Sequence, residues 1–228
     1  MAPLIICIES TDRFCSAALF EGAELRSVIN DNEPQSHAEK LAPMLASLRA
    51  EAGRNPDALA ISRGPGSYTG LRIGASLAKG LCFGWDIPLI SIDTLQALAW
   101  NMRQETDLWE GAVFIPMTDA RRMEVYTAVY EATALNCLLP VAPKILEPID
   151  FLGYATENKV VFAGSGAAKW RTHCDWSEQA LFLEHLLPRA ESMGALALDA
   201  FHAGQFEDVA YFEPFYLKQF QPGKGSVT

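Results

Sequence analysis

At 228 residues the chain is long enough for one large domain or two small ones, and since half of its residues are hydrophobic it can bury a sizeable core, which argues against intrinsic disorder. Its 28 acidic residues outnumber 18 basic ones and give a net charge of −10, which argues against a protein that binds nucleic acid on its own. Five widely spaced cysteines without a Cys-x-x-Cys motif are typical of cytosolic proteins, so we expect a cytoplasmic location with no disulfide framework and no zinc site.

Three strands followed by a helix are predicted at the start of the chain. A continuous apolar run over 3–9 predicts a buried strand, and two hairpin-linked strands follow over 14–20 and 24–30. Ser36 and Glu39 resemble a capping box at the start of the next helix. That helix carries one apolar stripe at helical spacing, formed by Ala38, Leu41, Ala42, Leu45 and Leu48.

The most distinctive segment is Gly64-Pro-Gly-Ser-Tyr-Thr-Gly-Leu-Arg-Ile-Gly, which links a predicted strand over 58–61 to a predicted helix over 70–84. Its first three residues predict a tight turn, because proline fixes φ and glycine allows positive φ. Glycines before a helix can bind an anion, but the segment matches neither common phosphate-loop pattern. By itself it is therefore a weak phosphate signal and a stronger structural one.

The helix after this turn is rich in small residues. Ser67 or Thr69 is expected to cap it by accepting a hydrogen bond from its first free N–H groups. Gly70 and Gly74 lie one turn apart on one face, which predicts a close approach of another segment. The spacing leaves two explanations open, namely packing within this chain and association with a helix of a partner.

A strand over 88–92 and a helix over 94–104 complete a first unit, and a boundary is expected over 104–110. A second copy of the layout begins with strands over 111–117, 124–131 and 136–146, and it continues with a strand over 159–163 and a helix over 191–204. The β-β-β-α-β-α-β-α order resembles the half-domain of actin, hexokinase and the Hsp70 ATPase. We therefore predict an α/β fold of two duplicated, ribonuclease-H-like half-domains with mixed sheets, over 1–104 and 105–228, whose last segment packs back on the body.

Several segments carry a resemblance to one family. The glycine-rich segment, with Gly64, Gly66, Thr69, Gly70 and Arg72, resembles the hallmark of the TsaB (YeaZ) family of bacterial tRNA threonylcarbamoyladenosine biosynthesis proteins. Other segments agree, among them Leu4-Ile-Ile-Cys-Ile-Glu-Ser-Thr, Asp119-Ala-Arg-Arg-Met-Glu-Val-Tyr and Glu213-Pro-Phe-Tyr-Leu-Lys. The resemblance extends over nearly the full length.

The resemblance implies an actin/hexokinase/Hsp70-like (ASKHA) fold and a non-catalytic role. The implied partner is a paralogous, TsaD-like subunit, which transfers a threonylcarbamoyl group to N6 of adenosine 37 in tRNAs that read codons beginning with A. A small TsaE-like ATPase is a further implied partner, tRNA is bound only through the complex, and the free protein often pairs with itself. No contact with a membrane is expected, because no apolar stretch reaches the roughly 20 residues that span a bilayer.

The resemblance also assigns residues to a partner interface. In that family the first half-domain contacts the catalytic subunit through a helical bundle. The expected interface residues are Ala38, Leu41, Ala42, Leu45, Gly70, Gly74, Leu77 and Leu81.

The residues that relatives use for catalysis and nucleotide binding are expected to be replaced or incomplete in this chain. The metal-binding His-x-x-x-His pair of the catalytic relative falls on Thr94 and Leu98, and leucine cannot bind a metal, so we expect neither metal nor transferase chemistry here. The second phosphate loop of the superfamily reads Asp-x-Gly-Gly, whereas Asp119 is followed by Ala120, Arg121 and Arg122, whose side chains would block a phosphate. The residues that remain of a vestigial nucleotide-binding site are Ser10, Thr11, Asp119, Gly164 and Gly166. We expect the chain to have no cofactor of its own, and we expect any ATP or ADP to bind at an interface shared with another subunit.

Two other functions are compatible with parts of the sequence or fold class. A small-molecule kinase of the same superfamily would use ATP and a carboxylate base, Glu9 or Asp119. A peptidase is unsupported, because the sequence has neither His-Glu-x-x-His nor Gly-x-Ser-x-Gly. Arg72 is expected to bond backbone or a carboxylate rather than a substrate.

Overall fold

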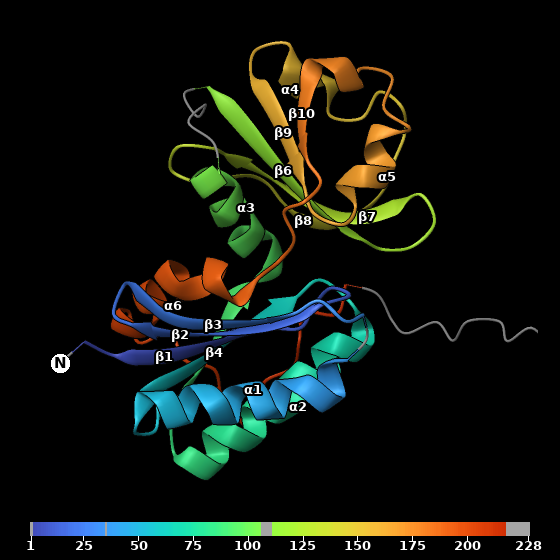
Figure 1. Ribbon diagram of the computed structural model, residues 1–228. Coiled ribbons are helices and arrows are strands. Elements are labelled where there is room, and N and C mark those ends of the chain that lie inside the picture. The colour runs from blue at the N-terminus through green and yellow to red at the C-terminus, as the bar shows by residue number, and fades with distance from the viewer. Residues whose placement is uncertain (1, 35, 106–110, 218–228) are drawn as a thin grey trace, which may run out of the picture.

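The computed structural model describes residues 2–34, 36–105 and 111–217, which form two mixed sheets with helices (Figure 1). The first sheet has the order β3-β2-β1-β4-β5. Its central strand β1 pairs antiparallel with β2 and parallel with β4, so that Cys7 lies opposite both Ala18 and Ala60. The strands of this sheet are β1 (Leu4–Glu9), β2 (Cys15–Glu21), β3 (Glu24–Asp31), β4 (Ala58–Gly64) and β5 (Leu89–Asp93).

The second sheet repeats the first. Read from one edge, its order is β8-β7-β6-β9-β10, with β6 antiparallel to β7 and parallel to β9, as β1 is to β2 and β4. The predicted α/β fold class, with two mixed sheets of the same layout, is thereby confirmed. Its strands are β6 (Ala112–Asp119), β7 (Glu124–Glu131), β8 (Cys137–Ile145), β9 (Lys159–Ala163) and β10 (Ala180–Leu183), of which only the short β10 was not predicted.

Helices cover both faces of the first sheet. Side chains alternate along β1, so Ile6 and Ile8 face α1 (His37–Ala52) and α2 (Tyr68–Trp85), whereas Ile5 and Cys7 face the opposite side. That opposite side is covered by η2 (Ala190–Met193) and α6 (Gly194–His202). In Figure 1, α1 and α2 lie on the side of the first sheet away from the second sheet.

The helix α3 (Thr94–Glu105) lies between the two sheets (Figure 1). Leu95, Leu98 and Met102 pack with residues of the second sheet, such as Phe114, while Ala97 belongs to the core on the first sheet. The other face of the second sheet packs around the fully buried Trp170. This face is covered by α4 (Leu152–Ala155), α5 (Ala167–Arg171) and η1 (Ser177–Gln179).

One local prediction holds in part and another was wrong. The helix predicted over 191–204 is present as α6, but the residues before Gly194 form the 3-10 turn η2. The predicted capping box does not form, because the Ser36 hydroxyl donates to the carboxylate of Asp31 and makes no cap bond to the helix. The hydroxyl thereby ties the end of β3 to the start of α1.

The last described segment, 205–217, runs back along the first sheet. The backbone N–H of Glu207 donates to Leu89 O at 2.8 Å, and that of Phe215 donates to Arg63 O at 2.7 Å. Residues 106–110, which include most of the predicted boundary, and Lys218 of the C-terminal motif lie outside the described residues. Within the described ranges, no helix combines the length and apolar character needed to cross a bilayer.

Candidate functional site

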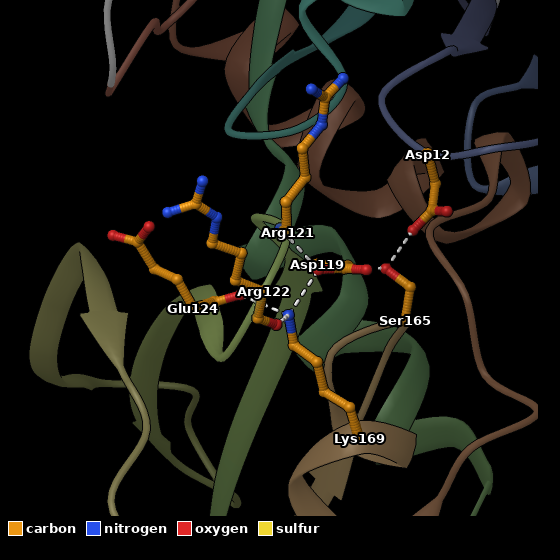
Figure 2. Close-up of polar contacts among 7 residues, drawn as sticks. All are labelled: Asp12, Asp119, Arg121, Arg122, Glu124, Ser165 and Lys169. Atoms are coloured by element: carbon orange, nitrogen blue, oxygen red, sulfur yellow. Dashed lines mark hydrogen bonds and ion pairs between the residues drawn. The ribbon is translucent and has the colours of Figure 1, made fainter. Parts of the chain in front are cut away.

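Three loops meet where the parallel strands of the two sheets end, and we call this place the mouth (Figure 2). They are the loop after β1, the β6–β7 hairpin and the loop after β9. The Ser165 hydroxyl donates to Asp12 Oδ2 at 2.7 Å and accepts from the backbone N–H of Asp119 at 3.1 Å. One serine therefore links a loop of the first sheet to two loops of the second.

A lysine from α5 fills the inner side of the β6–β7 hairpin. Lys169 Nζ donates to Asp119 Oδ1 at 2.5 Å, to Arg122 O at 2.8 Å and to Glu124 O at 2.5 Å (Figure 2). These three acceptors use all the donors of the ammonium group. Lys169 was not predicted as a site residue, and its signal in the sequence is its position shortly after Gly164-Ser165-Gly166.

The hairpin keeps a glycine-like backbone without glycines. Arg121 has φ of 70° and Arg122 has φ of 50°, in the left-handed region that side chains other than glycine rarely adopt. These are the two positions at which the superfamily pattern has glycine. Asp119 Oδ1 also accepts from the backbone N–H of Arg121 at 2.7 Å, so this carboxylate is bound by its own loop.

The acidic residue at the end of β1 is sealed inside the fold. Glu9 is fully buried, and it accepts from the Ser62 hydroxyl and from the backbone N–H of Thr11, the latter at 2.6 Å. Burial raises the pKa of Glu9 above its ordinary value, and these hydrogen bonds oppose the rise only in part. The side chains of Ser10 and Thr11 are also buried, and neither hydroxyl has a hydrogen-bond partner among the described residues.

The glycines of the motif segment are required by close packing within this chain. A Cβ on Gly70 would lie 2.0 Å from Ser10 O, and a Cβ on Gly74 would lie 2.2 Å from Ser10 Oγ. A Cβ on Gly66 would lie 2.3 Å from Thr11 O. Of the two explanations left open by the spacing, packing within the chain therefore holds for Gly70 and Gly74.

The start of α2 is otherwise close to the prediction. Gly64 has φ of 109°, and Ser67, not Thr69, caps the helix by accepting from the N–H of Gly70 at 3.3 Å. The expectation for Arg72 was wrong, because its guanidinium donates to the hydroxyl of Tyr68 at 3.3 Å and lies over that ring.

The loop after β9 packs in a similar way. A Cβ on Gly164 would lie 2.1 Å from Met117 O, and one on Gly166 would lie 2.7 Å from a methyl group of Val125. Both glycines are therefore explained by contact with the second sheet, whether or not a ligand approaches them. Among the described residues, no cluster of three or more metal-ligating side chains occurs.

The predicted partner interface needs correction at four positions. Leu41 and Leu45 are buried in the core beneath α1, and Gly70 and Gly74 are buried against Ser10, so none of these can face another protein. The physical reason is that the apolar stripe of α1 serves the core of its own chain. The remaining predicted residues, Ala38, Ala42, Leu77 and Leu81, are exposed or half-buried.

The outward side of α1 and α2 forms a surface of small and apolar residues, which we call the α1/α2 face. The Arg49 guanidinium of α1 lies over the Trp85 ring of α2 at 5.3 Å. The α1/α2 face comprises Ala38, Ala42, Ala46, Ile73, Leu77, Gly80 and Leu81.

Known proteins similar to this chain in sequence or structure are TsaD, TsaB and YeaZ proteins. The family model described as tRNA N6-adenosine threonylcarbamoyltransferase, TsaD, matches residues 32–211. The tRNA threonylcarbamoyladenosine biosynthesis protein TsaB of Haemophilus influenzae is 36% identical over 226 residues, which cover 94% of this chain and 93% of that protein. The TsaB protein of Escherichia coli is 30% identical over 227 residues, with 94% of both chains covered. The structure of YeaZ from Pseudomonas aeruginosa superimposes with a TM-score of 0.79 at 26% identity, covering 94% of this chain and all of that one.

Proposed function

The chain belongs to the TsaB (YeaZ) family of tRNA threonylcarbamoyladenosine biosynthesis proteins, and we propose that it acts there as an accessory subunit without catalytic chemistry of its own. Its task in this proposal is to support a TsaD-like transferase that modifies adenosine 37 of tRNAs reading codons that begin with A. The observation that carries the proposal is the state of the mouth. A nucleotide-binding relative needs a free carboxylate and two glycines in this hairpin. Here Lys169 binds the carboxylate of Asp119, and Arg121 and Arg122 stand at the glycine positions.

The same observation argues against the kinase alternative. A kinase needs a carboxylate that can reach the attacking hydroxyl group of its substrate. Glu9 is buried with both carboxylate oxygens hydrogen-bonded, and Asp119 binds Lys169. We therefore propose that the chain has no cofactor of its own and that any ATP or ADP binds at its interface with another subunit.

We place the contact with the transferase on the α1/α2 face. Two features support this choice: its small side chains allow helices to approach closely, and the half-buried Ile73, Leu77 and Leu81 would lose their remaining water on docking. The same face would serve a homodimer of the free chain, so that the homodimer and the heterodimer exclude each other. A TsaE-like ATPase and a cytoplasmic location complete the proposal.

Depletion in cells tests this function. Hydrolysed tRNA from cells depleted of this chain is analysed by mass spectrometry for threonylcarbamoyladenosine. We expect the modified nucleoside to fall strongly and to return when the wild-type chain is supplied. An unchanged level in fully depleted cells would contradict the proposal.

A further inference from the structure

Arg121 and Arg122 stand out among the arginines of the chain. Both are exposed, and within the described part of the chain neither side chain has a recorded hydrogen bond or ion pair. Other exposed arginines do find carboxylates, as Arg26 does with Glu21 and Arg54 with Asp57. Among the described residues, every other arginine side chain has a hydrogen bond, an ion pair or a contact with an aromatic ring, so these two adjacent cations are available to a ligand.

Their backbone gives the same indication. Both residues have positive φ, a conformation that is strained for any residue with a Cβ and that glycine would adopt freely. Strain of this kind is concentrated at functional sites. The fold itself gains nothing visible from the two side chains, since the recorded bonds of this turn go to backbone atoms of Arg121 and Arg122.

The turn that carries these arginines is rigid. Lys169 binds the carbonyls of Arg122 and Glu124, and the N–H of Glu124 donates to Arg121 O at 3.1 Å. The two guanidinium groups therefore extend from a fixed base (Figure 2). Less conformational entropy is lost on binding when the backbone is already held.

A third arginine flanks the mouth from the first sheet. Arg13 is exposed and follows Asp12, which Ser165 connects to the N–H of Asp119. Its guanidinium lies over the ring of Phe14 at 4.8 Å, which leaves its N–H donors available. The carboxylate of Asp119 is neutralised by Lys169.

We propose that Arg121 and Arg122, aided by Arg13, bind phosphate groups of the tRNA backbone once this chain is part of its complex. Guanidinium groups match phosphate through paired hydrogen bonds, and such contacts carry no base specificity. A free nucleotide is disfavoured, because Lys169 fills the inner side of the loop that its phosphates would need. This inference rests on the proposed function, and it assigns direct tRNA contact to a chain that was expected to meet tRNA only through its partners.

The test is tRNA binding by the complex of this chain with its TsaD-like partner. The probe is an unmodified transcript of a tRNA that reads a codon beginning with A, titrated by filter binding at several salt concentrations. The variant is the double substitution Arg121→Gln and Arg122→Gln. The control is Arg26→Gln with Arg54→Gln, which changes the net charge equally at exposed arginines that already have carboxylate partners.

For the arginine pair we expect tRNA affinity to fall about tenfold near 0.1 M salt, with a slope of log K against log salt that is shallower by about 1.5. The control should bind nearly as the wild type does. At saturating tRNA the control complex should modify it at the wild-type rate.

Wild-type tRNA affinity and slope in the arginine variant would overturn the inference. So would a loss of ADP binding, measured by equilibrium dialysis, with tRNA binding unchanged. A wild-type complex that fails to assemble or to modify tRNA would instead refute the proposed function, which distinguishes the two failures.

Discussion

The Ser165 hydroxyl donates to Asp12 Oδ2 at 2.7 Å and so joins two residues that are 153 positions apart in the chain. In this chain hydrogen bonds connect the loop after β1, the loop after β9 and the β6–β7 hairpin. Ser165 holds the loop after β1, while Lys169 holds the β6–β7 hairpin. The mouth is therefore a structural junction between the two sheets.

The glycine at position 70 should be indispensable for stability. Gly70→Ala places a Cβ 2.0 Å from Ser10 O, so α2 must move, and we expect a loss of about 1–3 kcal/mol in the free energy of unfolding. Gly80→Ala is the matched control, because nothing lies within 4 Å of its Cβ, and it should stabilise by up to about 1 kcal/mol. Urea denaturation measures both, and equal effects of the two substitutions would refute the packing argument.

The buried carboxyl of Glu9 should make stability depend on pH. Because burial raises its pKa in the folded state, the protonated form stabilises the fold fully below the ordinary value of 4.5, and that contribution is lost as pH rises through the folded pKa. Glu9→Gln keeps a neutral group that can bond both Ser62 and the N–H of Thr11. We expect the variant to match the wild type at low pH and to become relatively more stable as pH rises.

Denaturation curves at a series of pH values measure this difference. A difference between Glu9→Gln and the wild type that stays constant with pH would show that folding does not raise the pKa of Glu9.

The α1/α2 face should tolerate charge in the free chain but not in the complex. Ala42→Glu and Gly80→Glu add carboxylates at exposed positions, so we expect a normal fold and the loss of co-purification with the transferase. Ser47→Glu is the control, because it is also exposed on α1 but lies about 140° around the helix from Ala42. Retention of the transferase by well-folded Ala42→Glu and Gly80→Glu proteins would place the interface elsewhere.

The left-handed backbone at Arg121 should respond to glycine. Arg121→Gly relieves the positive φ, and we expect a free energy of unfolding about 0.5–1 kcal/mol above that of Arg121→Gln, which removes the charge without relieving the backbone. Thermal denaturation compares the two. If the glycine variant is no more stable than the glutamine variant, the side chain bears no cost at this position.

Much of the fold could be predicted because its signals are local. The apolar run before Glu9, the alternation over 124–131 and the turn around Gly64 each reflect one element, and a duplicated order of elements then gives the fold class. The 3-10 turn before α6 could not be predicted from the local pattern, nor could the contact of Gly194 at the start of α6 with the ring of Phe20, which is far away in sequence.

The site was less predictable, because it is formed by contacts between residues that lie far apart in the sequence. An apolar stripe and a pair of glycines on helices indicate close packing but do not identify what they pack against, so Leu45 and Gly74 were assigned to a partner when they serve their own core. The contacts of Lys169 join residues 45–50 positions apart, and no spacing rule connects them.

The central claim is that this chain supports a transferase and does not itself transfer the group. The direct measurement is the amount of threonylcarbamoyladenosine formed on a tRNA transcript by purified components, with this chain, the TsaD-like subunit or both present. The account predicts product when both are present, little with the TsaD-like subunit alone and none with this chain alone. Product formed by this chain without the TsaD-like subunit, or an undiminished yield when this chain is omitted, would contradict it.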